Sequence, residues 1–203
     1  MLFVSYGNVD SVPSDTDGLG LSEYRLDRLA NLRPAENRRQ SIGAELLLVK
    51  ELSAVGEAFP VPLHIGSGIN GKPCLLDSTI HFNLSHSGHF AACAVSDAPV
   101  GLDIQVISPC KDAVLCRCFC LDEQEYVRSS TDPDEAFTEV WTKKESYLKA
   151  LGQGLRKAMD SFSVFDLPDG ASVWHTALEG LHISVCSLTG SAIPDTLTKR
   201  KLP

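Results

Sequence analysis

The strongest structural signal in the sequence is a long helical pattern that begins at about Pro133 and ends at Gly152. Its large apolar side chains share one face of that helix: Phe137, Val140, Trp141, Tyr147, Leu148 and Leu151. Lys144 falls inside this apolar stripe, so its amine must either reach water or meet an anion. Glu145 and Lys149 lie four residues apart at the edge of the stripe, where the simplest interpretation is a helix-surface ion pair.

The rest of the chain alternates between helix and strand patterns. We expect strands at about residues 2–7, 80–84, 90–95, 99–107, 161–167, 171–177 and 181–188. We expect further helices at about 22–32, 34–55 and 111–119, and a short one whose capping box is Asp122 with Glu125. Helices and strands thus appear twice, which predicts an α+β fold with an N-terminal half (1–98) and a C-terminal half (99–203). The polar tail after Gly190 is expected to fray.

Composition bounds the function. The chain has 203 residues, of which 43% are hydrophobic and 22% charged, so it can bury a real core. It contains no apolar run long enough for a membrane span and no secretory leader, so we expect a cytoplasmic protein without a membrane partner. Its net charge of −8 argues against a nucleic-acid partner.

The charge is spread unevenly along the chain. Residues 25–50 contain six basic side chains against three acidic ones. A local basic patch on an acidic protein favours a small polyanionic ligand. The alternative is an ordinary pair of solvated amphipathic helices.

The seven cysteines, in a chain without an export signal, are typical of free thiols in a reducing compartment. Cys116, Cys118 and Cys120 alternate, but they form no C-x-x-C pair and have no histidine nearby. We therefore interpret them as small buried apolar residues rather than zinc ligands.

An acid inside an apolar strand marks the first candidate site. Asp103 lies two residues after Gly101, and it shares one strand face with Gln105. A buried carboxylate needs a partner, which is often a metal ion. Together with Glu145 from the long helix, these oxygen ligands would suit Mg²⁺ when phosphate groups of a substrate complete its shell.

A second candidate site lies in the segment Phe82–Gly88, where a strand ends in small hydroxyls, an imidazole and a glycine. Such a turn can offer hydrogen-bond donors to a phosphate, although His86 could equally be a structural histidine. Upstream of it, Gly71, Lys72 and Pro73 form a rigid turn that presents one lysine.

Taken together, these residues resemble a known family. Three blocks look like the signature of the surfactin-type (Sfp-type) 4′-phosphopantetheinyl transferases, in the right order and with the right gaps: Phe82–Gly88, Val100–Ile104 and Trp141–Lys149. Further similar segments are Gly71–Pro73, Arg39-x-x-x-Gly43, residues 117–126 and Asp160–Val164. The resemblance covers the chain from about residue 25 to residue 190.

The resemblance implies a pseudo-dimer of two similar α/β halves, with coenzyme A in the cleft between them. It implies transfer of 4′-phosphopantetheine from coenzyme A to a serine of an acyl or peptidyl carrier protein, with release of adenosine 3′,5′-bisphosphate. The implied roles are catalysis for Glu145 (as base) and Lys149, Mg²⁺ binding for Asp103, Gln105 and Glu145, and coenzyme binding for Arg39, Gly71, Lys72, Pro73, Ser85, His86, Asp103, Lys144 and Lys149. We expect the enzyme to be a monomer.

One departure is informative. Many members of the family have glutamate where this chain has Gln105, so one negative charge is missing from the expected metal shell. This departure leaves open a weakened homologue that still binds carrier proteins. A separate alternative is another Mg²⁺-dependent enzyme, such as a hydrolase, that acts on a phosphoanhydride similar to coenzyme A. Arg25 and Arg28 lie near the family's earliest basic contacts, and the sequence assigns neither of them a role.

Overall fold

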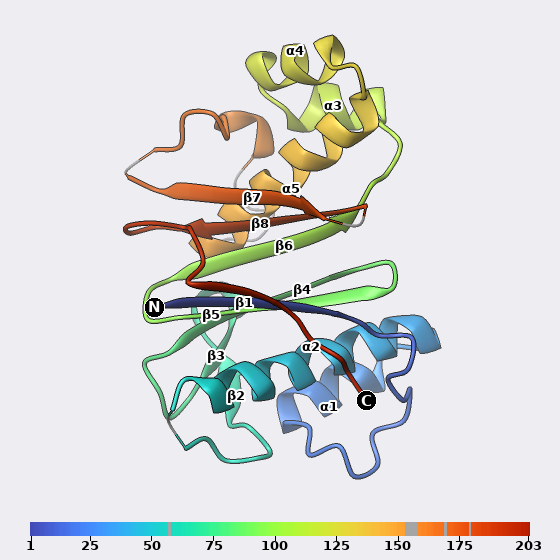
Figure 1. Cartoon of the computed structure of the whole chain (residues 1–203), viewed down its shortest axis with the longest axis vertical. Helices are drawn as coiled ribbons and strands as arrows, with labels where there is room; N and C mark the ends of the chain where they lie inside the picture. The colour runs from blue at the N-terminus through green and yellow to red at the C-terminus, as the bar shows by residue number, and fades with distance from the viewer. Residues whose placement is uncertain (57, 153–157, 169, 179) are drawn as a thin grey trace.

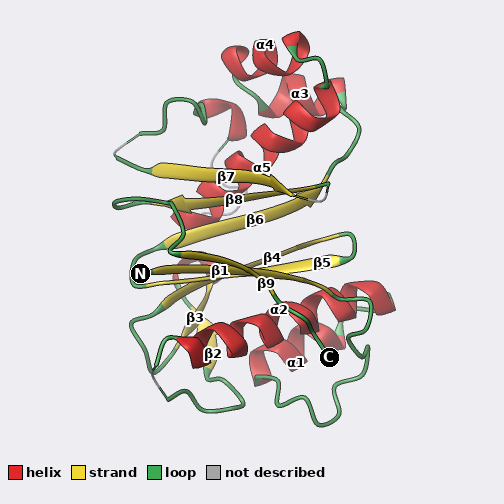
Figure 2. Ribbon diagram, in the orientation of Figure 1, coloured by secondary structure: helices red, strands yellow, loops and turns green. Residues whose placement is uncertain are grey.

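In a computed structural model, the chain forms four layers, helix, sheet, sheet and helix (Figure 1 and Figure 2). The structure describes residues 1–56, 58–152, 158–168, 170–178 and 180–203. Helices α1 and α2 cover one sheet, α5 covers the other, and the two sheets face each other in the middle. This mixed architecture confirms the predicted α+β class.

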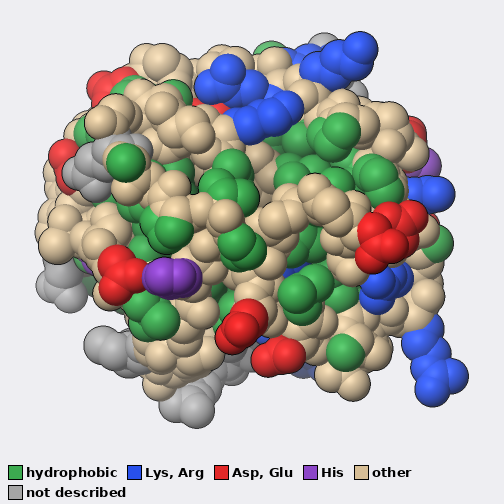
Figure 3. Space-filling model, turned by 90° about the horizontal axis from the view of Figure 1, so that it is seen from below, with side chains coloured by type: hydrophobic (Ala, Val, Ile, Leu, Met, Phe, Trp, Pro, Cys, Tyr) green, Lys and Arg blue, Asp and Glu red, His purple; other side chains and the backbone are tan. Residues whose placement is uncertain are grey.

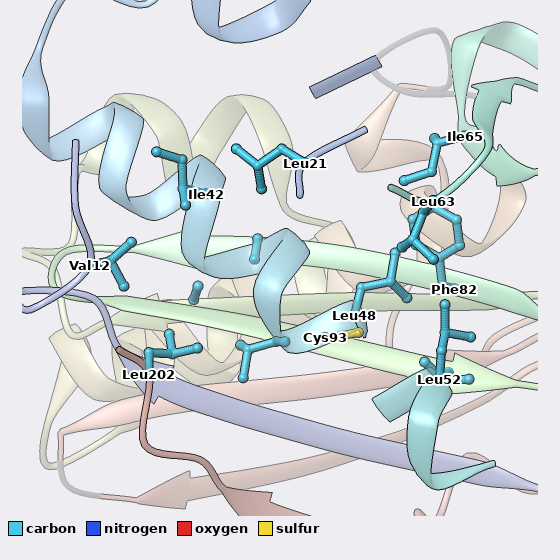
Figure 4. Packing of buried hydrophobic residues seen from close by; sticks show 14 of the residues in the cluster. Val12, Leu21, Ile42, Leu48, Leu52, Leu63, Ile65, Phe82, Cys93 and Leu202 are labelled. Carbon is cyan, nitrogen blue, oxygen red and sulfur yellow. The ribbon is translucent and has the colours of Figure 1, made fainter. Parts of the chain in front are cut away.

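The first sheet is built mainly from the N-terminal half. It has the strand order β4-β5-β1-β9, in which β9 is parallel to β1 and the other pairs are antiparallel. Its strands are β1 (Leu2–Asn8), β4 (His81–Ser87), β5 (Phe90–Ser96) and β9 (Thr196–Lys199). Its helices are α1 (Glu23–Ala30) and α2 (Ala35–Ala54), and a small hairpin of β2 (Ile65–Ser67) and β3 (Pro73–Leu75) lies beside them. Apolar side chains of α2, such as Leu48 and Leu52, pack with Phe82 and Cys93 of the sheet (Figure 4).

The second sheet is antiparallel and has the strand order β6-β8-β7. Its strands are β6 (Val100–Val106), β7 (Ser172–Leu178) and β8 (Leu181–Ser187). The long helix α5 (Pro133–Leu151) lies on the outer face, and α3 (Asp112–Cys118) and α4 (Leu121–Ser129) flank it. Inside, Leu102 and Ile104 of β6 pack with Val4 and Ala92 of the first sheet to form a core between the sheets.

Gly101 brings α5 close to β6. A Cβ atom at this position would lie 1.9 Å from the carbonyl oxygen of Ser146 and 2.3 Å from the backbone nitrogen of Ala150. No side chain fits there, because the neighbouring atoms belong to the helix backbone. The missing side chain therefore sets the distance between the helix that carries Glu145 and Lys149 and the strand that carries Asp103.

The structure confirms most of the predicted elements, and α5 has the predicted limits. Three predictions were wrong. The short helix α4 is capped by Cys120 with Glu123 rather than by Asp122 with Glu125. Residues 161–167 form an isolated bridge between Ser163 and Asp166 instead of a strand.

The tail after Gly190 is ordered rather than frayed. The backbone amide of Asp195 donates to the carbonyl of Leu2, β9 pairs with β1, and the side chain of Leu202 is 3% exposed. The sequence of the tail looks polar because alternate residues of an edge strand face water, while Ala192 and Leu202 are buried and Leu197 packs against the core between the sheets. None of the described helices combines the length and the apolar character that crossing a membrane requires.

We predict that Gly101→Ala lowers the free energy of unfolding by about 3 kcal/mol, because the helix backbone must move to admit the methyl group. The measurement is chemical denaturation. Gly18→Ala is the control: its new Cβ would meet nothing within 4 Å, and its φ of +72° should cost about 1 kcal/mol. Equal stability losses in the two variants would contradict the close packing of β6 and α5.

Candidate active site

The edges of the two sheets are joined by side chains. Strands β4 and β6 run side by side, and three polar residues of β4 accept hydrogen bonds from backbone amides of β6. Asn83 Oδ1 accepts from Leu102 N at 2.8 Å, Ser85 Oγ from Ile104 N at 3.3 Å, and Ser87 Oγ from Val106 N at 3.1 Å. We call this row of contacts the seam. It satisfies amides that an edge strand would otherwise leave unpaired.

Asp103 lies at the centre of the seam and is 2% exposed. Its Oδ1 accepts from Ser85 Oγ at 2.7 Å and from Lys149 Nζ at 2.6 Å, and its Oδ2 accepts from Gln105 Nε2 at 3.0 Å. Lys149 Nζ also donates to Ser85 Oγ at 2.9 Å. Residues from β4, β6 and α5 thus converge on one buried carboxylate.

Glu145 lies one helical turn before Lys149 and adds a second carboxylate. Burial raises its pKa, the negative charge of Asp103 raises it further, and the positive charge of Lys149 acts in the opposite direction. Asp103 is buried and Glu145 is half-buried, so their negative charges repel each other. A cation between the two carboxylates would remove this repulsion. Their hard oxygen donors suit Mg²⁺.

These two carboxylates do not make a complete metal cage. Among the described residues, no group of three or more His, Cys, Asp or Glu side chains is arranged to hold a metal ion. A Mg²⁺ ion at Asp103 and Glu145 would therefore need further oxygens from water or from a phosphorylated ligand, as is usual for this ion.

A pocket of about 330 Å³ extends from Lys149 to α1. Its wall contains four cationic side chains and one imidazole, namely Arg25, Arg28, Lys72, Lys149 and His86. Gly71 and Pro73 also line it. In the view from below, Lys and Arg side chains gather along the upper and right-hand edges of the face that the figure shows (Figure 3). Two residues of the basic stretch 25–50, Arg25 and Arg28, thus lie on the pocket wall together with Lys72 and Lys149, although the protein is acidic.

Arg25 is held rigidly at the far end of this pocket. Its Nε donates to Glu45 Oε2 at 3.0 Å and its Nη1 donates to Ser41 Oγ at 2.8 Å. The same Glu45 accepts from the backbone amide of Ser22, which caps α1, at 2.6 Å. Arg28 lies one turn further along α1, within 3.5 Å of the hydroxyl of Tyr24.

Lys72 connects the pocket to the second sheet. The turn before it is left-handed, with φ values of 57° at Asn70 and 80° at Gly71, and glycine accepts such a value without strain. Lys72 Nζ donates to the carbonyl of Val100 at 2.8 Å and to the carbonyl of Lys149 at 2.7 Å. Burial lowers its pKa to about 8. Among the described residues Lys72 Nζ makes these two hydrogen bonds, which leaves the third N–H of the ammonium group for a ligand.

His86 lies on the wall of the pocket beside Leu84. Burial lowers its pKa, and the positive charges of Lys149 and Arg25 lower it further, so the imidazole is neutral near pH 7. An anion bound in the pocket would reverse the effect of these charges and favour the protonated form.

Two predicted site residues lie elsewhere. Lys144 is fully buried on the other side of α5, where its Nζ donates to both carboxylate oxygens of Glu123, at 2.8 and 2.6 Å, and to the carbonyl of Phe162 at 2.7 Å. The sequence predicts that the Lys144 amine either reaches water or meets an anion, and the structure shows that it meets an anion, the carboxylate of Glu123. The structure does not place Lys144 at the pocket that the basic residues line.

Arg39 is the second predicted site residue that lies elsewhere. It does not line the pocket, and its buried Nε has no hydrogen-bond partner among the described residues. By contrast, Arg25 and Arg28, which the sequence left without a role, both line the pocket. Their spacing of three residues on one short helix was the available signal, because such residues share a helix face.

The geometry agrees with comparisons to known proteins. A sequence model of the 4′-phosphopantetheinyl transferase superfamily matches residues 99–193. The chain therefore belongs to the 4′-phosphopantetheinyl transferase superfamily and is a transferase of that class, which confirms the resemblance in the sequence.

Individual relatives carry the same name. The chain is 34% identical to the 4′-phosphopantetheinyl transferase gsp of Aneurinibacillus migulanus, over 98% of this chain and 90% of the relative. It is 33% identical to AcpT of Salmonella typhi, over 85% of this chain and 90% of the relative. It is 37% identical to Sfp of Bacillus subtilis (strain 168), over 49% of this chain and 46% of the relative.

We predict that Lys144→Met destabilises the fold by about 3–5 kcal/mol, because it leaves the carboxylate of Glu123 buried without a cation. Chemical denaturation measures the loss. The double variant Glu123→Gln with Lys144→Met should be more stable than the single variant, since it removes the unpaired charge. A single variant as stable as the parent would contradict the buried pair.

Proposed function

We propose that this protein transfers the 4′-phosphopantetheine group of coenzyme A to a serine of an apo acyl or peptidyl carrier protein. The serine oxygen attacks the phosphorus next to pantetheine, and the bond from that phosphorus to the bridging oxygen breaks. Adenosine 3′,5′-bisphosphate leaves with the bridging oxygen, and the serine proton passes to a base of the protein.

One observation carries the proposal: a single pocket joins the Asp103 and Lys149 cluster at one end to Arg25 and Arg28 at the other. Coenzyme A has phosphates in two places, a pyrophosphate at the reacting bond and a monoester on the ribose. A pocket with cations at two separate positions matches that pattern, and charge neutralisation with in-line positioning is what phosphoryl transfer requires.

We assign the pyrophosphate to the end at Asp103. Lys149 Nζ lies there, bonded to Asp103 and Ser85, and Lys72 Nζ is bonded to the backbone carbonyl of Lys149. Both ammonium groups line the pocket. Asp103 and Glu145 would hold Mg²⁺, which supplies neutralising charge to the pyrophosphate when it is bound. Lys149 is the residue of this chain that would stabilise negative charge on the reacting phosphate.

We assign the ribose phosphate to the end at α1. Arg25 is fixed by Glu45 and Ser41, so its guanidinium loses little freedom when it meets an anion. Arg28 and neutral His86 line the same end, and His86 would gain a proton when the phosphate binds. Arg39 remains a weaker candidate for this phosphate, supported by its unpartnered Nε.

We propose Glu145 as the base that accepts the proton of the carrier serine. A serine hydroxyl needs a positioned base to become a nucleophile. Burial and the neighbouring Asp103 raise the pKa of Glu145, which makes it a better proton acceptor than an exposed glutamate.

The proposal also covers the domain organisation, the oligomeric state and the cellular setting of the protein. We propose that residues 1–98 and 99–203 form the two halves of a pseudo-dimer, with β9 as the segment that returns to the first sheet. We also propose a cytoplasmic monomer that uses neither nucleic acid nor a membrane. The net charge of −8 and the seven free thiols support this setting.

The direct test is intact-mass spectrometry of an apo carrier protein incubated with the enzyme, coenzyme A and Mg²⁺. A gain of one phosphopantetheine group on the carrier supports the transferase. Hydrolysis of coenzyme A without a gain in carrier mass would indicate the hydrolase alternative. Complex formation with the carrier and no reaction would indicate a weakened binding homologue.

We predict that Glu145→Gln abolishes transfer while the thermal midpoint stays near that of the parent. The amide keeps the volume, but it can neither accept the serine proton nor offer a charged oxygen to Mg²⁺. Glu139→Gln, the same change on the same helix outside the pocket, is the control and should transfer normally. Near-normal turnover of Glu145→Gln in excess Mg²⁺ would contradict the mechanism.

We predict that Arg25→Ala and Arg28→Ala each raise the KM for coenzyme A about tenfold, with a smaller change in kcat, because contacts to the ribose phosphate are equal in the ground and transition states. Steady-state kinetics at low and high salt are the measurement. The exposed Arg33 provides a control, since Arg33→Ala should change neither parameter. Lys72→Ala should also lower kcat, because Lys72 holds the carbonyl of Lys149.

A further inference from the structure

Gln105 lies two residues after Asp103 on the same face of β6, and both ends of its side-chain amide are hydrogen-bonded. Its Nε2 donates to Asp103 Oδ2 at 3.0 Å, and its Oε1 accepts from Ser87 Oγ at 3.2 Å. The amide therefore bridges a residue of the first sheet and the central carboxylate of the site.

The direction of this amide follows from the groups around it. The Asp103 carboxylate can only accept hydrogen bonds, so it requires the NH₂ end of Gln105. Ser87 Oγ already accepts from the backbone amide of Val106 at 3.1 Å, which leaves its own hydrogen to donate. The carbonyl end of Gln105 is the acceptor within its reach. The backbone of β6 thus orients Ser87, Ser87 orients Gln105, and Gln105 orients Asp103.

This arrangement differs from that of a metal ligand. A glutamine binds a cation through its carbonyl oxygen, and here that oxygen is directed to Ser87 while the donor nitrogen is directed to Asp103. We propose that Gln105 is a positioning residue: it holds Asp103 in place by donation, Ser87 fixes its amide, and it does not ligate Mg²⁺. The inference rests on the proposed function only where it assigns Mg²⁺ to Asp103.

A positioning role also explains why position 105 can have an amide where many members of the family have a glutamate. A carboxylate at position 105 would face Asp103 Oδ2 with a like charge and no hydrogen to donate, so a cation or a proton would have to lie between them. The amide removes that repulsion. In this protein Asp103 therefore accepts three hydrogen bonds without a metal ion, from Ser85, Lys149 and Gln105.

The direct test is nuclear magnetic resonance of the full chain with ¹³C,¹⁵N-labelled glutamine. The chain has four glutamines, and the signal that disappears in Gln105→Met assigns the one of interest. On titration with Mg²⁺ in the presence of coenzyme A, we expect the carbonyl carbon of Gln105 to stay in place. A large displacement of that resonance, as direct ligation requires, would overturn the proposal.

Mg²⁺ affinity, measured by calorimetry with coenzyme A present, gives a second readout. We expect Gln105→Met and Ser87→Ala each to weaken Mg²⁺ binding about tenfold, as loss of an outer hydrogen bond to a metal ligand does. If Gln105 were a ligand, Ser87→Ala would release its carbonyl oxygen and leave affinity unchanged or higher, which would overturn the proposal. Ser53→Ala, on the exposed side of α2, is the control.

Stability and activity separate the remaining outcomes. Gln105→Met keeps the bond between Ser87 and Val106, so weaker Mg²⁺ binding in a variant with the parent's thermal midpoint is not a folding defect. Gln105→Glu should lower the thermal midpoint that is measured without metal. Addition of Mg²⁺ should then raise the thermal midpoint of this variant by more than it raises that of the parent. An unchanged metal-free midpoint would contradict the like-charge argument. Failure of the parent to modify a carrier would refute the proposed function and leave the amide orientation testable.

Discussion

The structure depends on the way two sheet edges are joined without a shared ladder of backbone hydrogen bonds. Asn83, Ser85 and Ser87 of β4 supply one side-chain acceptor for each alternate amide of β6. A continuous sheet would have placed those strands in one plane. Side-chain acceptors instead let the two sheets stack face to face while their edges stay in contact. Asp103 and its partners lie where these edges meet, so the fold and the site share the same hydrogen bonds.

A second buried interaction fixes the rotation of α5. The carboxylate of Glu123 accepts from Lys144, from the backbone amide of Cys120 at 2.8 Å and from that of Val164 at 2.8 Å, so it ties α4, α5 and the segment after residue 158 together. Lys144 is held on that side of α5, while Lys149 donates to Asp103 and Glu145 lies near enough to Asp103 for their charges to interact. The buried lysine in the apolar stripe thus helps to fix the helix that carries Glu145 and Lys149.

Much of this could be predicted from the sequence, for reasons that differ between elements. The limits of α5 follow from Pro133 and Gly152, and the shared strand face of Asp103 and Gln105 follows from the two-residue period of β6. The partner of Lys144 could not be found, because Glu123 is distant in the chain and no local pattern connects them. The orientation of the Gln105 amide could not be predicted from the sequence either. The sequence suggests an oxygen ligand, and only the neighbouring side chains show that the amide nitrogen faces Asp103. Likewise, two leucines in a polar tail, Leu197 and Leu202, do not reveal that β9 completes a sheet.

The position of β9 has a consequence for how the chain folds during synthesis. The first sheet contains residues from both ends of the sequence, since β9 pairs with β1 and the backbone amide of Arg200 donates to the carbonyl of Tyr6 at 2.8 Å. A ribosome therefore releases the last strand of this sheet after all of the second sheet. Until then the outer edge of β1 is an open strand edge, and the N-terminal half waits for the C-terminal residues before its core around Leu202 can close.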